Sequence, residues 1–109
     1  MEAQHFPVRD LLGRTAVDPE GRRLGRVTSV DCDLQEWRVA GVRVKLAREA
    51  VSRLHLEHLP FTDRTVEVPP RYVEVAGDYV LVTEPEEALR NEYLEEHRME
   101  GDEGSPESV

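Results

Sequence analysis

Two histidines stand three residues apart in a segment with helical spacing, a pattern that can hold a metal ion. His55 and His58 would share one helix face, with Cys32 or Glu57 as further ligands. No second ligand pair follows at a fixed spacing, as structural zinc sites require. We therefore interpret the two as surface and strand-edge histidines and expect no metal.

Two acidic residues flank the single cysteine. Asp31 and Asp33 share one face of an expected strand, and paired carboxylates can do acid–base chemistry. Cys32 alternates in phase with Val30 and Leu34, which predicts a small core residue rather than a nucleophile. We expect the carboxylates to face solvent or to pair with arginines of the neighbouring strand. No glycine-rich phosphate loop opens a helix, so we expect no enzyme and no cofactor.

Other residues are suited to binding. Trp37 stands beside Arg38 at the end of an expected hairpin, and both types are enriched at binding hot spots. The alternative is that Trp37 folds over the mouth of the domain. Leu89 and Tyr93 form a narrow apolar stripe on a helix near the end of the chain. These four residues make up the predicted partner-binding set.

Three arginines cluster around the first hairpin, at Arg22, Arg23 and Arg26. They could contact RNA phosphates, although no aromatic residues are interleaved with them. The alternative interpretation is a solvated or salt-bridged hairpin.

The charge of the chain is unevenly placed. The net charge is −9, and residues 84–109 alone hold ten acids and two arginines. This acidic end disfavours nucleic acid and suits a basic protein surface; a solubilising tail is the alternative. With one cysteine, no signal pattern in MEAQHFPVRD and no long apolar run, we expect a cytoplasmic protein without direct membrane insertion.

The first hairpin is the best-specified local structure. The turn Asp18-Pro19-Glu20-Gly21 has the residue preferences of a type I turn, between strands expected at 15–17 and 26–33. In the second strand the apolar phase changes between Val27 and Val30, which predicts a bulge or strong bend. Gly25 at its start predicts bending or a close approach of two backbones.

Alternation and turn residues place further strands at 38–46, 66–68, 72–75 and 79–82, with a helix over 47–59. Thr83 and Glu86 fit a capping box that opens an acidic helix, and Glu86 and Arg90 are spaced for an ion pair. The expected organisation runs in four parts along the chain: a flexible lead (1–10), a β-rich domain (11–83), the acidic helix (84–99) and a disordered acidic tail (100–109).

Glycines and turn residues carry a family resemblance. The motifs Leu12-Gly13-Arg14, Asp18-Pro19-Glu20-Gly21 and Leu24-Gly25-Arg26-Val27 resemble the opening of a PRC-barrel domain. The motifs Val66-Glu67-Val68-Pro69, Tyr72-Val73 and Gly77-Asp78-Tyr79-Val80-Leu81-Val82 resemble its closing strands, especially those of stand-alone archaeal members. The resemblance implies a mostly β fold: a small six-stranded PRC-type barrel with a short inserted helix and a C-terminal acidic helix.

Three groups of the family suggest different functions. The photosynthetic reaction-centre H subunit carries a transmembrane helix and RimM-type ribosome maturation factors carry a second barrel, neither of which we expect here. Single-domain archaeal cell-division adaptors match in size, and are implied to dimerise and to bind SepF, which tethers FtsZ to the membrane. We expect a homodimeric adaptor recruited to the division site by SepF or another PRC-barrel protein. The alternative is a RimM-like factor that associates with RNA or the ribosome.

Overall fold

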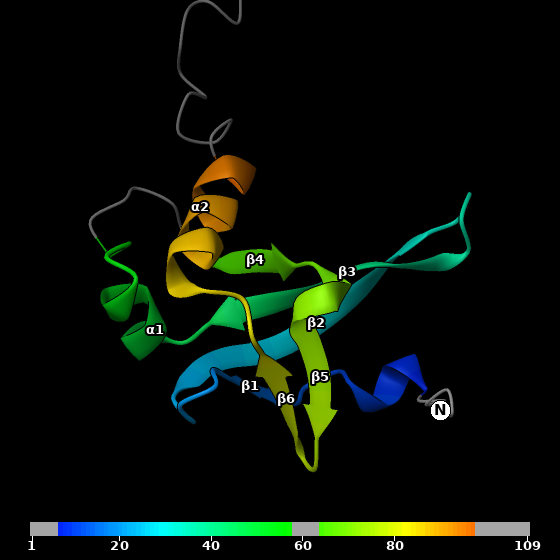
Figure 1. Ribbon diagram of the computed structural model, residues 1–109, viewed down its shortest axis with the longest axis horizontal. Helices are drawn as coiled ribbons and strands as arrows, with labels where there is room; N and C mark the ends of the chain where they lie inside the picture. The colour runs from blue at the N-terminus through cyan, green and yellow to red at the C-terminus, as the bar shows by residue number, and fades with distance from the viewer. Residues whose placement is uncertain (1–6, 58–63, 98–109) are drawn as a thin grey trace, which may run out of the picture.

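The centre of the molecule is one mixed six-stranded β-sheet (Figure 1). The computed structural model describes residues 7–57 and 64–97. The strand order is β4-β3-β2-β1-β6-β5; β1 pairs in parallel with β6, and the other neighbours are antiparallel. The strands are β1 (Thr15–Val17), β2 (Arg23–Asp33), β3 (Arg38–Leu46), β4 (Thr65–Val68), β5 (Val73–Ala76) and β6 (Tyr79–Val82).

Residues 7–57 and 64–97 also contain four short helical elements. They are η1 (Val8–Asp10), α1 (Arg48–Arg53), η2 (Pro70–Tyr72) and α2 (Glu86–Glu96). The mostly β architecture with an inserted helix and a C-terminal helix is confirmed. Within the described ranges, no helix combines the length and the apolar character needed to cross a bilayer.

The inserted helix is shorter than the expected 47–59. It ends at Arg53, and His55 then takes a left-handed conformation with φ 60°. This reversal returns the chain to the body, so that Leu56 is buried although it lies off the helical stripe. His58 and the acidic tail (100–109) lie outside the described residues.

The first turn forms as predicted and is held by its own side chain. The backbone N–H of Gly21 donates to the carbonyl oxygen of Asp18 at 2.9 Å. The buried Asp18 carboxylate accepts the backbone N–H groups of Glu20 (3.0 Å) and Arg22 (2.8 Å). Such local hydrogen bonds are why Asp is favoured at the first position of a turn.

Strand β2 is bent at two places. Gly25 pairs with Ala16 and Leu46, and a Cβ at this position would collide with the carbonyl oxygen of Lys45. Farther along, Thr28 is an extra residue opposite β3, which confirms the predicted bulge. The close approach at Gly25 and the bulge at Thr28 let β2 bend away from the barrel.

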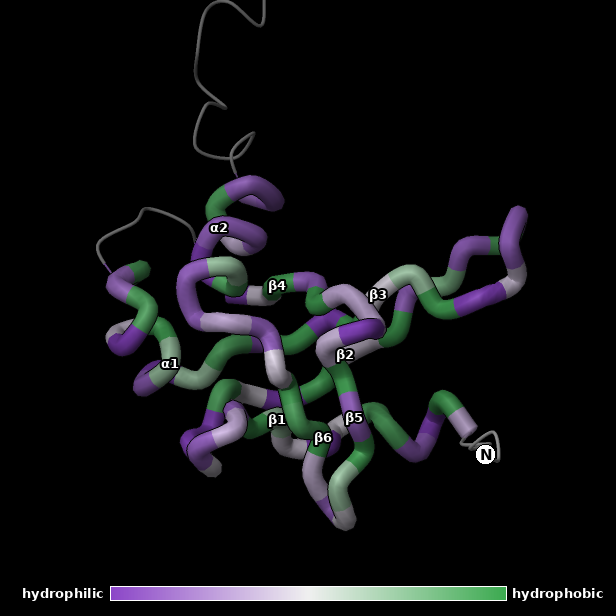
Figure 2. Tube along the Cα trace, viewed as in Figure 1, coloured by the Kyte–Doolittle hydropathy of each residue, from purple (hydrophilic) through white to green (hydrophobic). Residues whose placement is uncertain are grey.

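The core fills the inside of the curled sheet. The end strands β4 and β5 are linked by η2, which follows Pro69 and begins at Pro70, two residues that cannot donate to a ladder. Hydrophobic residues run along β3 and β6, whereas most of α2 is hydrophilic (Figure 2). The largest fully buried side chains are Leu89, Val27, Val44, Val66, Val68, Val80 and Val82.

The predicted capping box at the start of α2 is wrong. Thr83 Oγ1 donates to the carbonyl oxygen of Tyr72 (3.4 Å), and the backbone N–H of Thr83 bonds the same oxygen (2.8 Å). Thr83 thus continues the β5–β6 ladder, and the helix begins at Glu86 without a side-chain cap. Arg90 does not pair with Glu86 as expected, because its Nε donates to the carbonyl oxygen of Leu54 (2.9 Å).

Helix α2 covers the open edge of β4. The backbone N–H of Glu67 donates to Glu96 Oε2 at 2.6 Å, and His97 Nε2 hydrogen-bonds the carbonyl oxygen of Thr65 at 2.9 Å. Two side chains at the end of α2 therefore take the place of a neighbouring strand. An edge strand left bare is a template for pairing with other chains, so this contact protects the sheet.

The close approach at Gly25 gives a stability prediction. Gly25→Ala forces the backbone of Lys45 away, and we expect a loss of about 3 kcal/mol in the free energy of unfolding. Gly13→Ala is the control, because Gly13 has φ +84° with no atom within 4 Å of the added Cβ, so only backbone strain of about 1 kcal/mol applies. Urea unfolding of both variants measures the difference; equal losses would contradict the contact.

Candidate functional site

The distal parts of β2 and β3 leave the sheet together. Strand β1 pairs with β2 no farther than Arg26, and β4 pairs with β3 only from Val42 to Lys45. Residues 29–41 therefore form a two-stranded ribbon, the arm, which projects from the body (Figure 1). An isolated two-stranded hairpin is only marginally stable in water, so contacts with the body must help to hold the arm.

The tip of the arm, residues 34–37, is fixed by one carboxylate. Asp33 Oδ1 accepts the backbone N–H groups of Gln35 (3.0 Å) and Glu36 (3.3 Å). Trp37 closes the turn in a left-handed conformation with φ 56°. That conformation costs an ordinary residue about 1–2 kcal/mol, and glycine or asparagine usually occupies it.

The tip presents apolar side chains to solvent. Trp37 is 81% exposed and Leu34 is 67% exposed, and Arg38 is exposed beside them. Trp37 does not fold over the mouth of the barrel, so that alternative is wrong, and its role in binding stays a prediction. A large side chain that keeps both an unfavourable backbone and full exposure points to a function outside the monomer.

Arg43 anchors the base of the arm. Its guanidinium lies 3.0 Å from Glu67, 3.1 Å from Glu96 and 3.7 Å from Asp31. The expectation that Asp31 pairs with an arginine of the neighbouring strand is confirmed. Burial, followed by the hydrogen bond and charge of the nearby Asp31 carboxyl, raises the pKa of Glu67. One arginine thus ties the arm to β4 and α2.

Two open cavities follow the β3 side of the arm and share Ala40. The cavity at the base measures about 490 Å³ and is lined by Ala40, Arg43, Glu67, Pro69, Glu92 and Glu96. The cavity toward the tip measures about 410 Å³ and is lined by Asp33, Arg38, Val39, Ala40, Pro70 and Arg71. The flank of the arm is therefore hollowed from the tip to the body.

The prediction that Cys32 belongs to the core is wrong. Cys32 and Leu34 are exposed, whereas Val30, Asp31 and Asp33 are half-buried. The alternation continues past the point where β1 and β4 end, so this stretch of the arm has no core beneath it.

Leu89 and Tyr93 do not lie on the surface. Their side chains are 2% and 3% exposed, and both belong to the core cluster beneath α2. The narrow apolar stripe of α2 thus packs against the body, so Leu89 and Tyr93 are not accessible to a partner. Trp37 and Arg38 remain, and Leu34 joins them.

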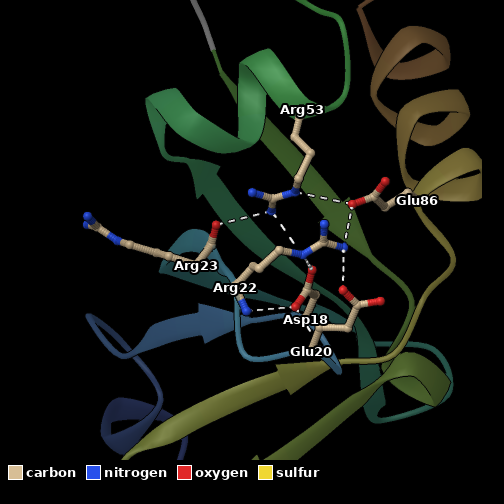
Figure 3. A network of polar contacts seen from close by, with 6 residues as sticks. All are labelled: Asp18, Glu20, Arg22, Arg23, Arg53 and Glu86. Carbon is tan, nitrogen blue, oxygen red and sulfur yellow. Dashed lines mark hydrogen bonds and ion pairs between the residues drawn. The ribbon is translucent and has the colours of Figure 1, made fainter.

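Of the three hairpin arginines, Arg22 is held in ion pairs within the molecule, whereas the Arg23 side chain points away from this network (Figure 3). Arg22 contacts Asp18 (2.7 Å) and Glu86 (3.0 Å), and Arg53 contacts the same Glu86 carboxylate (3.2 Å). These contacts join the first turn to α1 and α2 and favour the salt-bridged interpretation for Arg22. Burial opposes ionisation of Asp18, but the hydrogen bonds and charge of Arg22 outweigh it and lower the pKa of Asp18.

The histidine pair is only half described. His55 is exposed in its left-handed turn, and His58 lies outside the described residues. The expectation that these histidines bind no metal therefore stays a prediction.

A curled six-stranded sheet with an inserted helix defines a small domain of the β-barrel class. The family model of the PRC-barrel domain matches residues 3–89, and the chain belongs to this family. No curated protein matches the chain. The matched range extends past β6 to Leu89, so it includes the first core residue of α2.

The backbone cost at Trp37 is testable. Trp37→Gly removes the left-handed strain and little buried surface, so we expect the free energy of unfolding to rise by up to about 1 kcal/mol. Thermal and urea unfolding measure the change. Trp37→Ala, which keeps the strain, is the control and should gain nothing; destabilisation by the glycine variant would contradict the strain.

The Asp18 network predicts a pH dependence. Because the folded pKa of Asp18 is lowered from its ordinary value of 3.8, the charged carboxylate stabilises the fold above that value. This stabilisation is lost as pH falls through the folded pKa. Asp18→Ala should lose about 1–3 kcal/mol near neutral pH through its broken hydrogen bonds.

Asp18→Asn separates the charge from the hydrogen bonds, because asparagine still accepts the two backbone N–H groups. Urea unfolding across the acid range should show wild type and Asp18→Asn converging as pH falls. A constant difference between them would refute the role of the charge.

Proposed function

We propose that the protein is a non-enzymatic interaction module that binds another protein through the tip of the arm. The single observation that carries this proposal is Trp37, held 81% exposed in a left-handed turn at the end of a projecting hairpin. The Asp33 hydrogen bonds fix the tip before binding, which lowers the entropy lost on association.

The chemistry of the tip defines the kind of partner. Trp37 and Leu34 are apolar knobs, and Arg38 is a cation beside them. Binding hot spots combine such aromatic and arginine side chains at the centre of an interface, where water is excluded. A fitting partner offers an apolar pocket with an acidic or carbonyl-rich rim.

The partner is proposed from the family. We propose a homodimer that acts as a cell-division adaptor and binds SepF at the FtsZ division site, in line with the single-domain archaeal members that the chain resembles. The support is the family membership over residues 3–89 and a tip that no part of the described chain covers.

The RimM-like alternative has less support. It rested on the RimM-like fold and on the first-hairpin arginines, of which Arg22 is engaged with Asp18, Glu20 and Glu86. Arg23 and Arg26 are exposed. The acidic end of the chain would also repel phosphates. We therefore place the working surface on the arm rather than on the first hairpin.

The only tryptophan of the chain reports on its own binding. Trp37 emission should shift to shorter wavelength when the tip enters an apolar pocket, either on adding SepF or with increasing protein concentration. Leu34→Ser keeps the fluorophore and should weaken binding at least about tenfold, which corresponds to about 1.4 kcal/mol.

Tyr79→Ser is the matched control, because Tyr79 is another exposed apolar residue but lies on β6, away from the arm. It should leave the affinity unchanged. If neither SepF nor a second copy shifts the emission, the proposed partners are refuted; equal effects of both variants would refute the tip as the binding surface.

A further inference from the structure

A buried carboxyl group lies at the joint between the sheet and α2. Strand β6 ends at Val82, α2 begins at Glu86, and Glu84 lies between them with only 5% of its surface exposed. Among the residues that the structure describes, no group hydrogen-bonds its buried Oε1. Burying a charged carboxylate without a partner is costly, whereas the protonated form costs much less.

The charged groups that face Glu84 come from two elements. Glu92 of α2 repels a charge on Glu84, and Arg71 of η2 attracts it. Burial, assisted by the Glu92 charge and opposed by Arg71, raises the pKa of Glu84 to about 7. The group therefore changes its charge near neutral pH.

The residues before and after Glu84 make different contacts with the body. Thr83 is fixed to the carbonyl oxygen of Tyr72 by its backbone and its side chain. Beyond Glu84, the helix carries the two groups that cover the β4 edge, Glu96 and His97. A charge at this joint thus acts on the element that closes the sheet.

We propose that Glu84 is a protonation-dependent latch: its neutral carboxyl keeps α2 docked on β4, and its ionisation loosens the helix and uncovers the β4 edge. The loosened state exposes the backbone N–H of Glu67, which Glu96 otherwise covers, and the apolar side chains of Leu89 and Tyr93, which α2 otherwise buries against the body. The latch acts on α2, whose Glu96 also contacts Arg43 at the base of the arm (3.1 Å).

The sign follows from linkage. The pKa of Glu84 is higher in the docked state than its ordinary value of 4.5, so its contribution to docking is fully present below that value. The contribution is lost as pH rises through about 7. The opening equilibrium of α2 then increases by at most about 300-fold, the ratio that corresponds to the two pKa values.

Amide hydrogen exchange of the full chain tests the latch at residue resolution. We compare wild type with Glu84→Gln from about pH 5.5 to about pH 8.5, corrected for intrinsic exchange. In wild type, protection of the Glu67 amide and of α2 should fall at least about tenfold more than in β1 and β2 across this range. Glu84→Gln should abolish this difference.

Glu87→Gln is the matched control, because it makes the same change on the same helix at an exposed position. It should keep the wild-type pH dependence. Equal pH dependence in wild type and Glu84→Gln would overturn the latch, as would an equal effect of the two variants.

Carbon-13 NMR of the side-chain carboxyls gives a second measurement that needs no Glu84 variant. The Glu84 carboxyl should titrate near 7, and Glu92→Gln should lower this midpoint by removing a repelling charge. A midpoint near the ordinary value of 4.5 would overturn the proposal.

Discussion

One strand belongs to both the barrel and the arm, and the rest of the structure depends on how it bends. The start of β2 pairs with β1, the strand pairs with β3 from Gly25 to Asp33, and its end projects with β3 from the rest of the sheet. Gly25 allows contact with the Lys45 backbone, and the extra residue Thr28 redirects the strand. Without these two features, β2 and β3 would continue the curl of the sheet, and the tip with Trp37 would not project.

Local signals predicted most of the fold because they act within a few residues. The Asp18 turn, the strand alternation and the phase change after Val27 all appear where expected. The start of α2 was wrong for a physical reason: Thr83 has a backbone partner in Tyr72, and a ladder hydrogen bond prevails over a local cap. Likewise, Arg90 bonds the distant carbonyl oxygen of Leu54 rather than its neighbour on the helix.

The candidate site was predicted in part. Residue type and a hairpin end were enough to single out Trp37. Alternation could not show where neighbouring strands stop, so Cys32 was placed in the core in phase with Leu34, although both are exposed. Burial of Leu89 and Tyr93 depends on where α2 docks. The shared use of Glu86 by Arg22 and Arg53 joins segments 64 and 33 residues apart, beyond any local pattern. Nothing in the sequence near Glu84 signals its burial.

The parallel pairing of β1 with β6 has a consequence for how the domain is made. The first strand, β1, has β2 on one side, but its other neighbour is β6, the last of the described strands along the chain. During synthesis, β1 must therefore wait with one side unfilled until residues 79–82 have left the ribosome. Contacts of such long sequence separation slow folding and make it all-or-none. A nascent chain stalled before β6 leaves one side of β1 unpaired, and unpaired strand edges are prone to aggregation.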